Sequence, residues 1–330
     1  MAGGEGTMNL LVTGGAGFIG SHACEYFLGQ GCRVTALDNF DPFYPPEQKR
    51  RNIAVALAHP NYRLVEGDFG DRPAISRLLQ TGKFDLVLHL AAQAGVRPSL
   101  ADPLKYERVN VQGLIAMLEA LREHGPRRLV AASSSSVYGE VTPAPFREDA
   151  PCLEPLSPYA ATKRAAEIFL GTYHQLYGFQ IIIVRPFSVY GPRQRPDMAI
   201  AAFARKILLG ETVRLFGDGS SARDYTYVSD IVAGLAAAVE RFPVKFGIYN
   251  LGDSTPVSLK ELLAALEHAV GKTAKVRHEA PQPGDVTRTC ADISKAGQDL
   301  GYAPQVGLAA GLARTLDWVK GELRREGRGV

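Results

Sequence analysis

The stretch LLVTGGAGFIG, residues 10–20, decides the fold of this chain. An apolar run leads directly into glycines, after which the pattern becomes helical. Two glycine spacings overlap: Gly15, Gly17 and Gly20 fit G-x-G-x-x-G, and Gly14, Gly17 and Gly20 fit the looser G-x-x-G-x-x-G. Glycine lets a strand turn sharply into a helix and lets the backbone approach a phosphate, to which the helix N-terminus offers free N–H groups. Taken alone, this pattern is equally typical of an ordinary tight turn.

An acidic residue at the end of the next strand makes the pattern more specific. Residues 33–38 read RVTALD, so Asp38 stands at the strand tip, 18 residues beyond Gly20. An acid there accepts hydrogen bonds from the adenosine ribose hydroxyls and repels a 2′-phosphate. The unit therefore predicts NAD rather than NADP, with these cofactor-binding residues in its first part: Gly14, Gly17, Phe18, Ile19, Gly20, Asp38 and Asn39.

Length and composition describe a globular protein with more than one domain. The chain has 330 residues, 46% of them hydrophobic and 22% charged, and a formal net charge of +3, whereas a typical domain has ~100–200 residues. No long run of like charge argues for a nucleic-acid surface. No apolar stretch reaches the ~18–20 residues of a membrane span, and residues 1–7 lack the apolar core of a signal peptide. We expect neither nucleic acid nor membrane as a partner.

The cysteines are scattered along the chain. Cys24, Cys32, Cys152 and Cys290 form no C-x-x-C pair and show no metal-ligand spacing. Such usage in a chain of this length is typical of the reducing cytoplasm. We therefore expect a cytoplasmic protein without a metal site.

Strand-like and helical runs alternate further along, as in a parallel α/β sheet. The third expected strand ends at Asp68 and Phe69, which suit either an adenine contact or a simple turn. The fourth, residues 84–90, is almost entirely apolar, which indicates a central strand buried on both faces. Small residues follow it and leave room for a cofactor, so the candidate contacts here are Leu90, Ala91, Ala92 and Gln93.

Two polar residues after the fourth strand have alternative interpretations. Arg97 suits either a substrate anion or the cap of a turn. Asn110 interrupts the apolar stripe of a long helix expected over residues 103–124. It suits a bond to buried backbone, and we also count it among the candidate cofactor contacts. The stripe itself is typical of a core or of a dimer face.

Serines at the end of the fifth strand precede a tyrosine and a lysine. Residues 128–132 run into four serines, and YAATK then opens a helix expected over residues 158–177. Tyr159 and Lys163 are spaced i and i+4, so they share one helix face. A free tyrosine has a pKa near ~10, which a neighbouring lysine and a cationic nicotinamide lower, and a serine hydroxyl holds the substrate oxygen. After a dinucleotide-binding unit, this pair predicts catalysis rather than a surface contact.

The alternation loosens beyond a sixth strand at residues 180–187, and a smaller lobe begins there. We expect an NAD-binding domain of residues 8–187 plus about 225–257, and a smaller lobe of about 188–224 plus 258–330. The expected fold class is α/β, with a doubly wound parallel (Rossmann) sheet and a smaller C-terminal α/β substrate lobe.

These motifs together resemble the extended short-chain dehydrogenase/reductase family, and within it the NAD-dependent sugar-nucleotide epimerases. The resemblance covers nearly the whole chain. TGGAGFIGSH is similar to the cofactor turn of that family, SSSSVYG to its serine strand, YAATK to its Tyr–Lys helix and RDYTYVSD to its nucleotide-binding turn. A narrower group, the UDP-glucuronate 4-epimerases, has stretches similar to DNFDPFY with KRRNI, QAGVRPS, YGPRQRPDM and QPGDV.

The resemblance implies a role for each matching residue and a UDP-sugar as substrate. Tyr159 is the base, Lys163 is its partner on the nicotinamide ribose, and Ser134 holds the C4 oxygen. The residues implied at the UDP-sugar are Arg97, Ser135, Ser136, Ser188, Arg195, Arg223 and Asp285, of which the serines surround the sugar carboxylate and the last two hold UDP. Many relatives acting on UDP-glucose carry an arginine three residues before the acid matched by Asp285, where this chain has Gln282. The resemblance also implies a homodimer paired through residues of about 103–124 and 158–177.

The implied reaction is a transient oxidation at C4 of UDP-glucuronate, with a 4-keto intermediate and return of the hydride to the opposite face. Oxidation there creates a β-keto acid that readily loses CO₂, so the carboxylate must be held out of line with the ketone. UDP-glucuronate decarboxylases tend to carry a glutamate where this chain has Ser136, which favours epimerisation. The second alternative is a 4-epimerase that acts on UDP-glucose or another UDP-hexose, and the third is a decarboxylase or a dehydratase. A non-catalytic NAD sensor is disfavoured by the presence of Tyr159 and Lys163.

Overall fold

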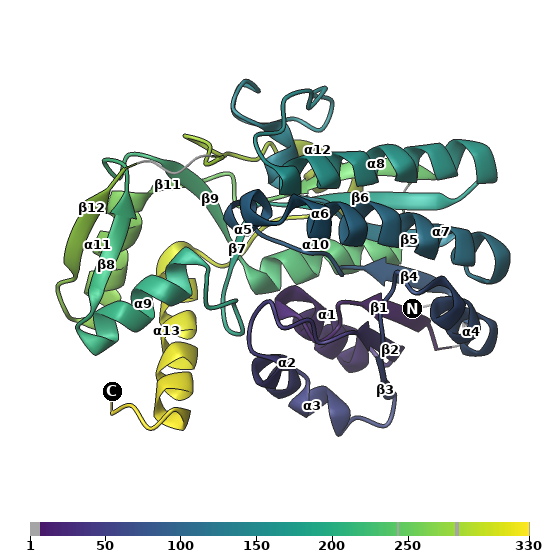
Figure 1. Ribbon diagram of the computed structural model, residues 1–330, viewed down its shortest axis with the longest axis horizontal. Coiled ribbons are helices and arrows are strands. Elements are labelled where there is room, and N and C mark those ends of the chain that lie inside the picture. The colour runs from purple at the N-terminus through teal and green to yellow at the C-terminus, as the bar shows by residue number, and fades with distance from the viewer. Residues whose placement is uncertain (1–6, 243, 281–283, 330) are drawn as a thin grey trace.

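The computed structural model describes residues 7–242, 244–280 and 284–329 (Figure 1). Its main sheet has seven parallel strands in the order β10-β6-β5-β4-β1-β2-β3, which confirms the expected doubly wound α/β fold. The strands of this sheet are β1 (Asn9–Thr13), β2 (Arg33–Asp38), β3 (Tyr62–Glu66), β4 (Leu86–His89), β5 (Arg128–Ala132), β6 (Gln180–Pro186) and β10 (Phe246–Leu251).

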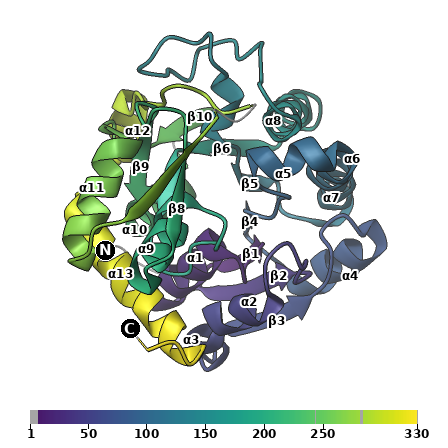
Figure 2. The ribbon, with the colours of Figure 1, turned by 60° about the vertical axis from the view of Figure 1, so that its left-hand side comes forward.

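Helices cover both faces of this sheet (Figure 2). One face carries α1 (Phe18–Gly29) and α10 (Val228–Arg241), and the other carries α4 (Arg72–Gly82), α7 (Gly113–His124) and α8 (Pro158–Tyr177). Successive side chains of β1 alternate between the two cores: Leu10 and Val12 pack beneath α1, and Leu11 packs with α7. A strand buried on both faces reads as a continuous apolar run, which is why the sequence revealed these strands.

A smaller lobe lies at one end of the sheet, on the left of Figure 1. Two parallel strands pair there, and three short strands form a second small sheet in the order β11-β9-β7. The hydrophobic core between the sheet and α1, which contains Leu10 and Val12, extends into this lobe without a break. The elements are β7 (Ser188–Tyr190), α9 (Ala199–Leu209), β8 (Thr212–Phe216), β9 (Ala222–Tyr227), β11 (Pro256–Ser258), α11 (Leu259–Val270), β12 (Lys275–Glu279) and α13 (Leu308–Arg325).

The long helix expected over residues 103–124 is divided in three. It consists of α6 (Pro103–Glu107), a π-helical turn (Arg108–Gln112) and α7. The extra residue of a π turn is a local distortion that hydrophobic spacing does not reveal. Likewise, β9 begins at Ala222, where the sequence indicated a turn, because residues there pair with β7 and β11. Short helices complete the fold: α2 (Pro46–Asn52), α3 (Ala54–Leu57), α5 (Val96–Ala101) and α12 (Ser294–Leu300).

The strand order defines where a ligand fits. The order reverses between β1 and β4, and in such sheets a crevice opens there at the carboxyl ends of the strands. Within the described ranges, no helix combines the length and the apolar character that a bilayer crossing requires.

Candidate active site

A cavity of about 460 Å³ occupies this crevice, between the sheet and the smaller lobe. It is lined by the ends of several parallel strands on one side and by Arg223 and Asp285 on the other. The cavity brings most of the predicted site residues together: Gly14, Gly17, Phe18, Ile19, Gly20, Asp38, Asn39, Phe69, Leu90, Ala91, Ala92, Gln93, Ser134, Ser135, Ser136, Tyr159, Lys163, Ser188, Arg195, Arg223 and Asp285.

Three predicted residues are not part of this lining. Asn110 is buried in the π turn, where its amide bonds both backbone atoms of Gln93 (2.8 and 3.0 Å) and the Thr162 hydroxyl (3.0 Å). Asp68 bonds Asn39 and the Gly70 N–H. Arg97 forms an ion pair with Asp285, and its role is considered below. These contacts orient the cavity wall, and direct ligand contact by the three residues stays a prediction.

The glycine turn leaves no room for side chains beside the cavity. Gly14 has φ of 72°, and a Cβ there would lie 2.8 Å from the Ala91 nitrogen. A Cβ on Gly20 would overlap the Gly14 carbonyl oxygen. Gly15, by contrast, packs against Ala36 and does not line the cavity. The looser of the two glycine spacings is therefore the one that faces the cavity, at the N-terminus of α1, where a pyrophosphate fits.

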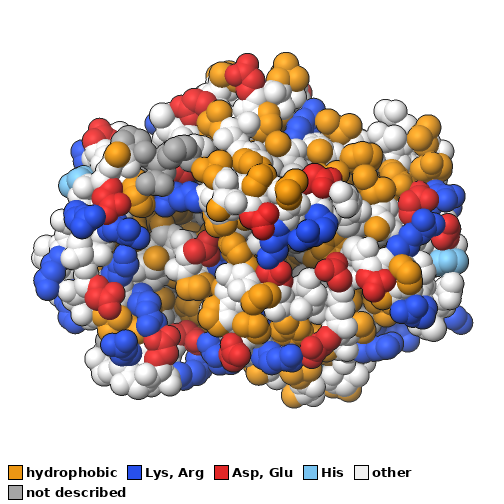
Figure 3. Space-filling view, viewed as in Figure 1, with side chains coloured by type: hydrophobic (Ala, Val, Ile, Leu, Met, Phe, Trp, Pro, Cys, Tyr) orange, Lys and Arg blue, Asp and Glu red, His pale blue; other side chains and the backbone are white. Residues whose placement is uncertain are grey.

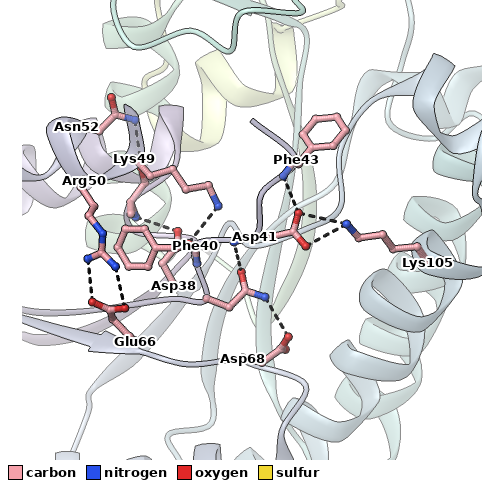
Figure 4. Close-up of polar contacts among 12 residues, drawn as sticks. Asp38, Phe40, Asp41, Phe43, Lys49, Arg50, Asn52, Glu66, Asp68 and Lys105 are labelled. Carbon is pink, nitrogen blue, oxygen red and sulfur yellow. Dashed lines mark hydrogen bonds and ion pairs between the residues drawn. The ribbon is translucent and has the colours of Figure 1, made fainter. Parts of the chain in front are cut away.

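Asp38 presents a buried carboxylate at the tip of β2 (Figure 4). It accepts hydrogen bonds from the Ala16 and Phe40 N–H groups at 3.1 and 2.9 Å, and from Lys49 Nζ at 3.2 Å. Lys49 comes from α2 and lines the cavity as well. Sequence reasoning did not single out this lysine, although it is the first residue of the stretch KRRNI quoted above. These contacts hold the carboxylate in one orientation at the cavity wall.

The loop after β2 is tied down at two points, also visible in Figure 4. Asn39 Nδ2 donates to Asp68 at 3.0 Å, and Asp41 forms an ion pair of 3.0 Å with Lys105 of α6. Phe43, two residues further on, lines the cavity. The loop thus leads from the carboxylate of Asp38 to Phe43, which lies beside Arg195 in the cavity.

The expected catalytic residues stand at the end of β5 and in the first turns of α8. That helix begins at Pro158, after Ser157 has capped it by accepting the Ala160 N–H. Lys163 Nζ donates to the Ala132 carbonyl at 2.8 Å, and burial lowers the pKa of this lysine to about 8, although Glu167 opposes the shift. Burial raises the pKa of Tyr159, while a bond to Ser134 and the positive charge of Arg195 lower it. Arg195 is thus a cation acting on the tyrosine that sequence reasoning had not connected with it.

The serines after β5 are bonded to one another. Ser134 Oγ accepts the Ser136 N–H at 3.2 Å and the Ser136 hydroxyl at 2.9 Å. A serine hydroxyl has two acceptor lone pairs and one donor. Both lone pairs of Ser134 are therefore engaged, which leaves its proton to be donated to Tyr159 or to a ligand oxygen.

Three arginines predicted to bind the substrate lie in or beside the cavity. Arg195 forms a two-bond ion pair with Asp197, and Arg223 donates to the Ala222 carbonyl at 2.9 Å. Arg97 pairs with Asp285 at 2.7 Å and lies over the Phe216 ring, so α5 contacts the smaller lobe here. Gln282, which the sequence marked as a departure from some relatives, lies outside the described residues.

The donor set fits a dinucleotide and a redox reaction. A glycine cradle that a Cβ would fill, the buried carboxylate of Asp38, the half-buried Tyr159 and the buried Lys163 line one continuous cavity. Among the side chains that the structure describes, no three His, Cys, Asp or Glu residues converge as metal ligands.

Comparison with known proteins gives the same picture. The model of the "NAD dependent epimerase/dehydratase family" matches residues 10–252. The chain is 40% identical over 311 residues to a UDP-glucuronate 4-epimerase of Thermodesulfobacterium geofontis, covering 94% of this chain and 95% of that protein.

Solved structures agree with the sequence comparison. The UDP-glucuronic acid 4-epimerase of Bacillus cereus, in complex with UDP-glucuronic acid and NAD, superimposes with a TM-score of 0.90 at 37% identity over 96% of this chain and 100% of the other. The UDP-glucose 4-epimerase of Thermus thermophilus, in complex with NAD, gives 0.85 at 37% identity over 95% and 99%. This chain therefore belongs to the NAD-dependent epimerase/dehydratase family.

Proposed function

We propose that this chain is a UDP-glucuronate 4-epimerase, which interconverts UDP-glucuronate and UDP-galacturonate with bound NAD. The observation that carries the proposal is the shared cavity of Tyr159, Lys163 and Arg195, in a chain 40% identical to a UDP-glucuronate 4-epimerase. The tyrosine and lysine supply redox acid–base chemistry, and the arginine offers a cation to an acidic sugar.

Each end of the cavity has a distinct task in this proposal. Gly14, Gly17 and Gly20 admit the pyrophosphate at the start of α1, and Asp38 accepts the hydroxyls of the adenosine ribose. When bound, NAD supplies the acceptor and donor of the hydride. Arg223 and Asp285 lie where the smaller lobe meets the cavity and hold the UDP part.

The residues of the chain then handle the proton at O4. Ser134 donates a hydrogen bond to O4, because both of its lone pairs are engaged by Ser136. Tyr159 takes the O4 proton while C4 is oxidised, and returns it when the 4-keto sugar has turned its other face and is reduced. The positive charge of Arg195 supports the phenolate form, which burial alone disfavours.

The acidic sugar imposes a further demand on the site. A 4-keto glucuronate is a β-keto acid, so it loses CO₂ when the bond to the carboxylate aligns with the carbonyl π system. Ser135, Ser136, Ser188 and Arg195 line the same cavity and keep the carboxylate out of that alignment. A serine rather than a glutamate at position 136 agrees with epimerisation.

The test is to incubate the purified protein with UDP-glucuronate and no added NAD, and to separate the nucleotide sugars. We expect UDP-galacturonate without release of CO₂, since the cofactor is regenerated in each turnover. Conversion of UDP-glucose but not of UDP-glucuronate would instead favour the second candidate, a UDP-glucose 4-epimerase. The similarity to the UDP-glucose 4-epimerase of Thermus thermophilus supports this candidate.

We also propose that two copies of the chain pair through α6, α7 and α8. Large apolar side chains are exposed on α6 and α8, which flank α7, at Leu104 (76%), Ile168 (57%) and Leu176 (67%), and Figure 3 shows hydrophobic side chains gathered on this face of the molecule. Light scattering should give twice the monomer mass, and Ile168→Asp should reduce it to the monomer mass.

The division of the chain and its cellular location are proposals as well. We propose that residues 8–187 plus about 225–257 bind NAD, and that about 188–224 plus 258–330 bind the UDP-sugar. The cysteines Cys24, Cys32, Cys152 and Cys290 are free thiols, which supports a reducing compartment, the cytoplasm. Fractionation with a tagged chain tests the location.

A further inference from the structure

We propose that Phe43 and Asp197 are positioning residues that lock the guanidinium of Arg195 and thereby make the site selective for an acidic sugar. The inference rests on the proposed function, because it concerns the residue that meets the sugar carboxylate. It adds two residues from different halves of the molecule, to neither of which the motifs gave a role.

The contacts of Arg195 leave one part of its guanidinium free. Its Nε and Nη2 donate to the two carboxylate oxygens of Asp197, each at 3.0 Å. Its Cζ lies over the face of the Phe43 ring, 5.3 Å from the ring centre. One edge and one face are thus occupied, so the remaining donors of Nη1 and Nη2 are the ones available to a ligand.

The three side chains differ in how exposed they are and in whether they line the cavity. Arg195 and Phe43 line the cavity, whereas Asp197 is outside it and its side chain is 44% exposed. The Arg195 side chain is only 18% exposed. Asp197 therefore fixes the guanidinium from the solvent side, and Phe43 supports it within the cavity, without either taking the place of the carboxylate.

Locking a long side chain in advance has a physical benefit. A free arginine side chain loses rotamer entropy when it is ordered on binding, and a planar fork fixed beforehand loses less of it. A carboxylate that meets a fixed guanidinium is held in one orientation. For the 4-keto acid this orientation decides the outcome, because only an aligned carboxylate leaves as CO₂.

Decarboxylation of the 4-keto acid is the side reaction that a fixed Arg195 prevents. In the aligned 4-keto acid the C5–C6 bond breaks and CO₂ departs. The electron pair passes to the C4 oxygen as an enolate, and C5 then takes up a proton. The hydride removed from C4 stays with the cofactor, so the sugar released is a 4-keto pentose rather than an epimer.

The chain contains a matched control in Arg147 and Asp149. The two residues have the same i, i+2 spacing and the same pairing of Nε and Nη2 with the two carboxylate oxygens, at 3.3 and 3.4 Å. Both side chains are largely exposed, at 66% and 72%, and neither lines the cavity. Asp149→Asn therefore removes an equivalent ion pair that has no access to the sugar.

The experiment compares five variants with wild type on UDP-glucuronate, measuring UDP-galacturonate and CO₂ in the same reaction. In Asp197→Asn and Phe43→Leu we expect the ratio of CO₂ to epimer to rise about tenfold or more and kcat/KM to fall about tenfold. Asp197→Glu and Phe43→Tyr retain the charge or the ring and should remain close to wild type, as should Asp149→Asn. An unchanged ratio in both Asp197→Asn and Phe43→Leu would overturn the proposal.

A binding measurement separates this proposal from the proposed function. In the Tyr159→Phe background, calorimetry gives the affinities for UDP-glucuronate and UDP-glucose without turnover. Adding Asp197→Asn should reduce the preference for UDP-glucuronate about tenfold, and an unchanged preference contradicts the lock even if the wild type proves not to be an epimerase. Should Phe43→Leu fail to fold, as its melting curve would reveal, Asp197→Asn decides the question.

Discussion

The two ends of the cavity are built from different materials. The cofactor end is mainly backbone: glycines that tolerate no Cβ, the start of α1, and Asp38 held by two N–H groups. The sugar end is made of side chains from separate elements, among them Ser134, Tyr159 and Arg195. Substitutions that add volume should therefore impair the cofactor end. Substitutions that change a proton donor, a charge or a side-chain orientation should impair the sugar end.

The largest expected effect is at the sugar end, in Tyr159→Phe. The ring still packs edge-to-face against Tyr106, but no group remains to take the O4 proton. We expect kcat to fall by on the order of 10³-fold, with NAD content and UDP affinity close to wild type. If NAD is lost together with activity, the two ends are not separable and the comparison fails.

At the cofactor end, Gly14→Ala should have the next largest effect. The new Cβ would lie 2.8 Å from the Ala91 nitrogen on a residue with φ of 72°, so the turn must shift or strain by about 1–2 kcal/mol. We expect NAD content to fall by roughly tenfold or more and the melting temperature to drop by several degrees. Gly29→Ala, at the far end of α1 and with nothing within 4 Å of its Cβ, is the control and should bind NAD normally.

Asp38→Asn, also at the cofactor end, should have a smaller effect, on the preference for NAD over NADP. The amide keeps the size of the side chain but leaves Lys49 without its anion, so a negative 2′-phosphate is no longer repelled. We expect the preference for NAD over NADP to decline by about tenfold, measured by fluorescence titration of the apoprotein. Glu66→Gln removes an acid at the tip of the neighbouring strand, in an exposed pair with Arg50, and should leave the preference intact.

The smallest expected effect is a shift in a pH profile, which Arg195→Met should show in addition to its loss of affinity for the acidic sugar. The positive charge of Arg195 lowers the pKa of Tyr159, and in the proposed reaction the tyrosine acts as a base only when deprotonated. Removing that charge raises the pKa, so the rise of kcat/KM with pH should move to higher pH. A profile that stays in place would show that Arg195 acts on the carboxylate alone.

The two ends also differ in how far they could be predicted from sequence. Residues 158–177 and 33–38 were expected as a helix and a strand, and α8 and β2 have those bounds, because their periodicity is strong and their caps are local. The glycine turn and Asp38 follow one another closely in the chain, so local spacing reveals them.

The features missed by sequence reasoning depend on tertiary contacts. Lys49 meets Asp38 only because α2 folds back over the strand tip, and Phe43 meets Arg195 across about 150 residues of sequence. The π turn at Asn110 arises where the amide bonds the backbone of Gln93. Hydrophobic spacing carries no signal for any of these three.

The most direct test of the account follows one hydrogen atom. UDP-glucuronate deuterated at C4 is incubated with the purified protein in ordinary water, without added NAD, and the UDP-galacturonate formed is analysed by mass spectrometry and NMR. We predict that the product retains the deuterium at C4, because the same hydride leaves and returns within one cavity. Loss of the label to solvent, or the absence of UDP-galacturonate, would contradict the account.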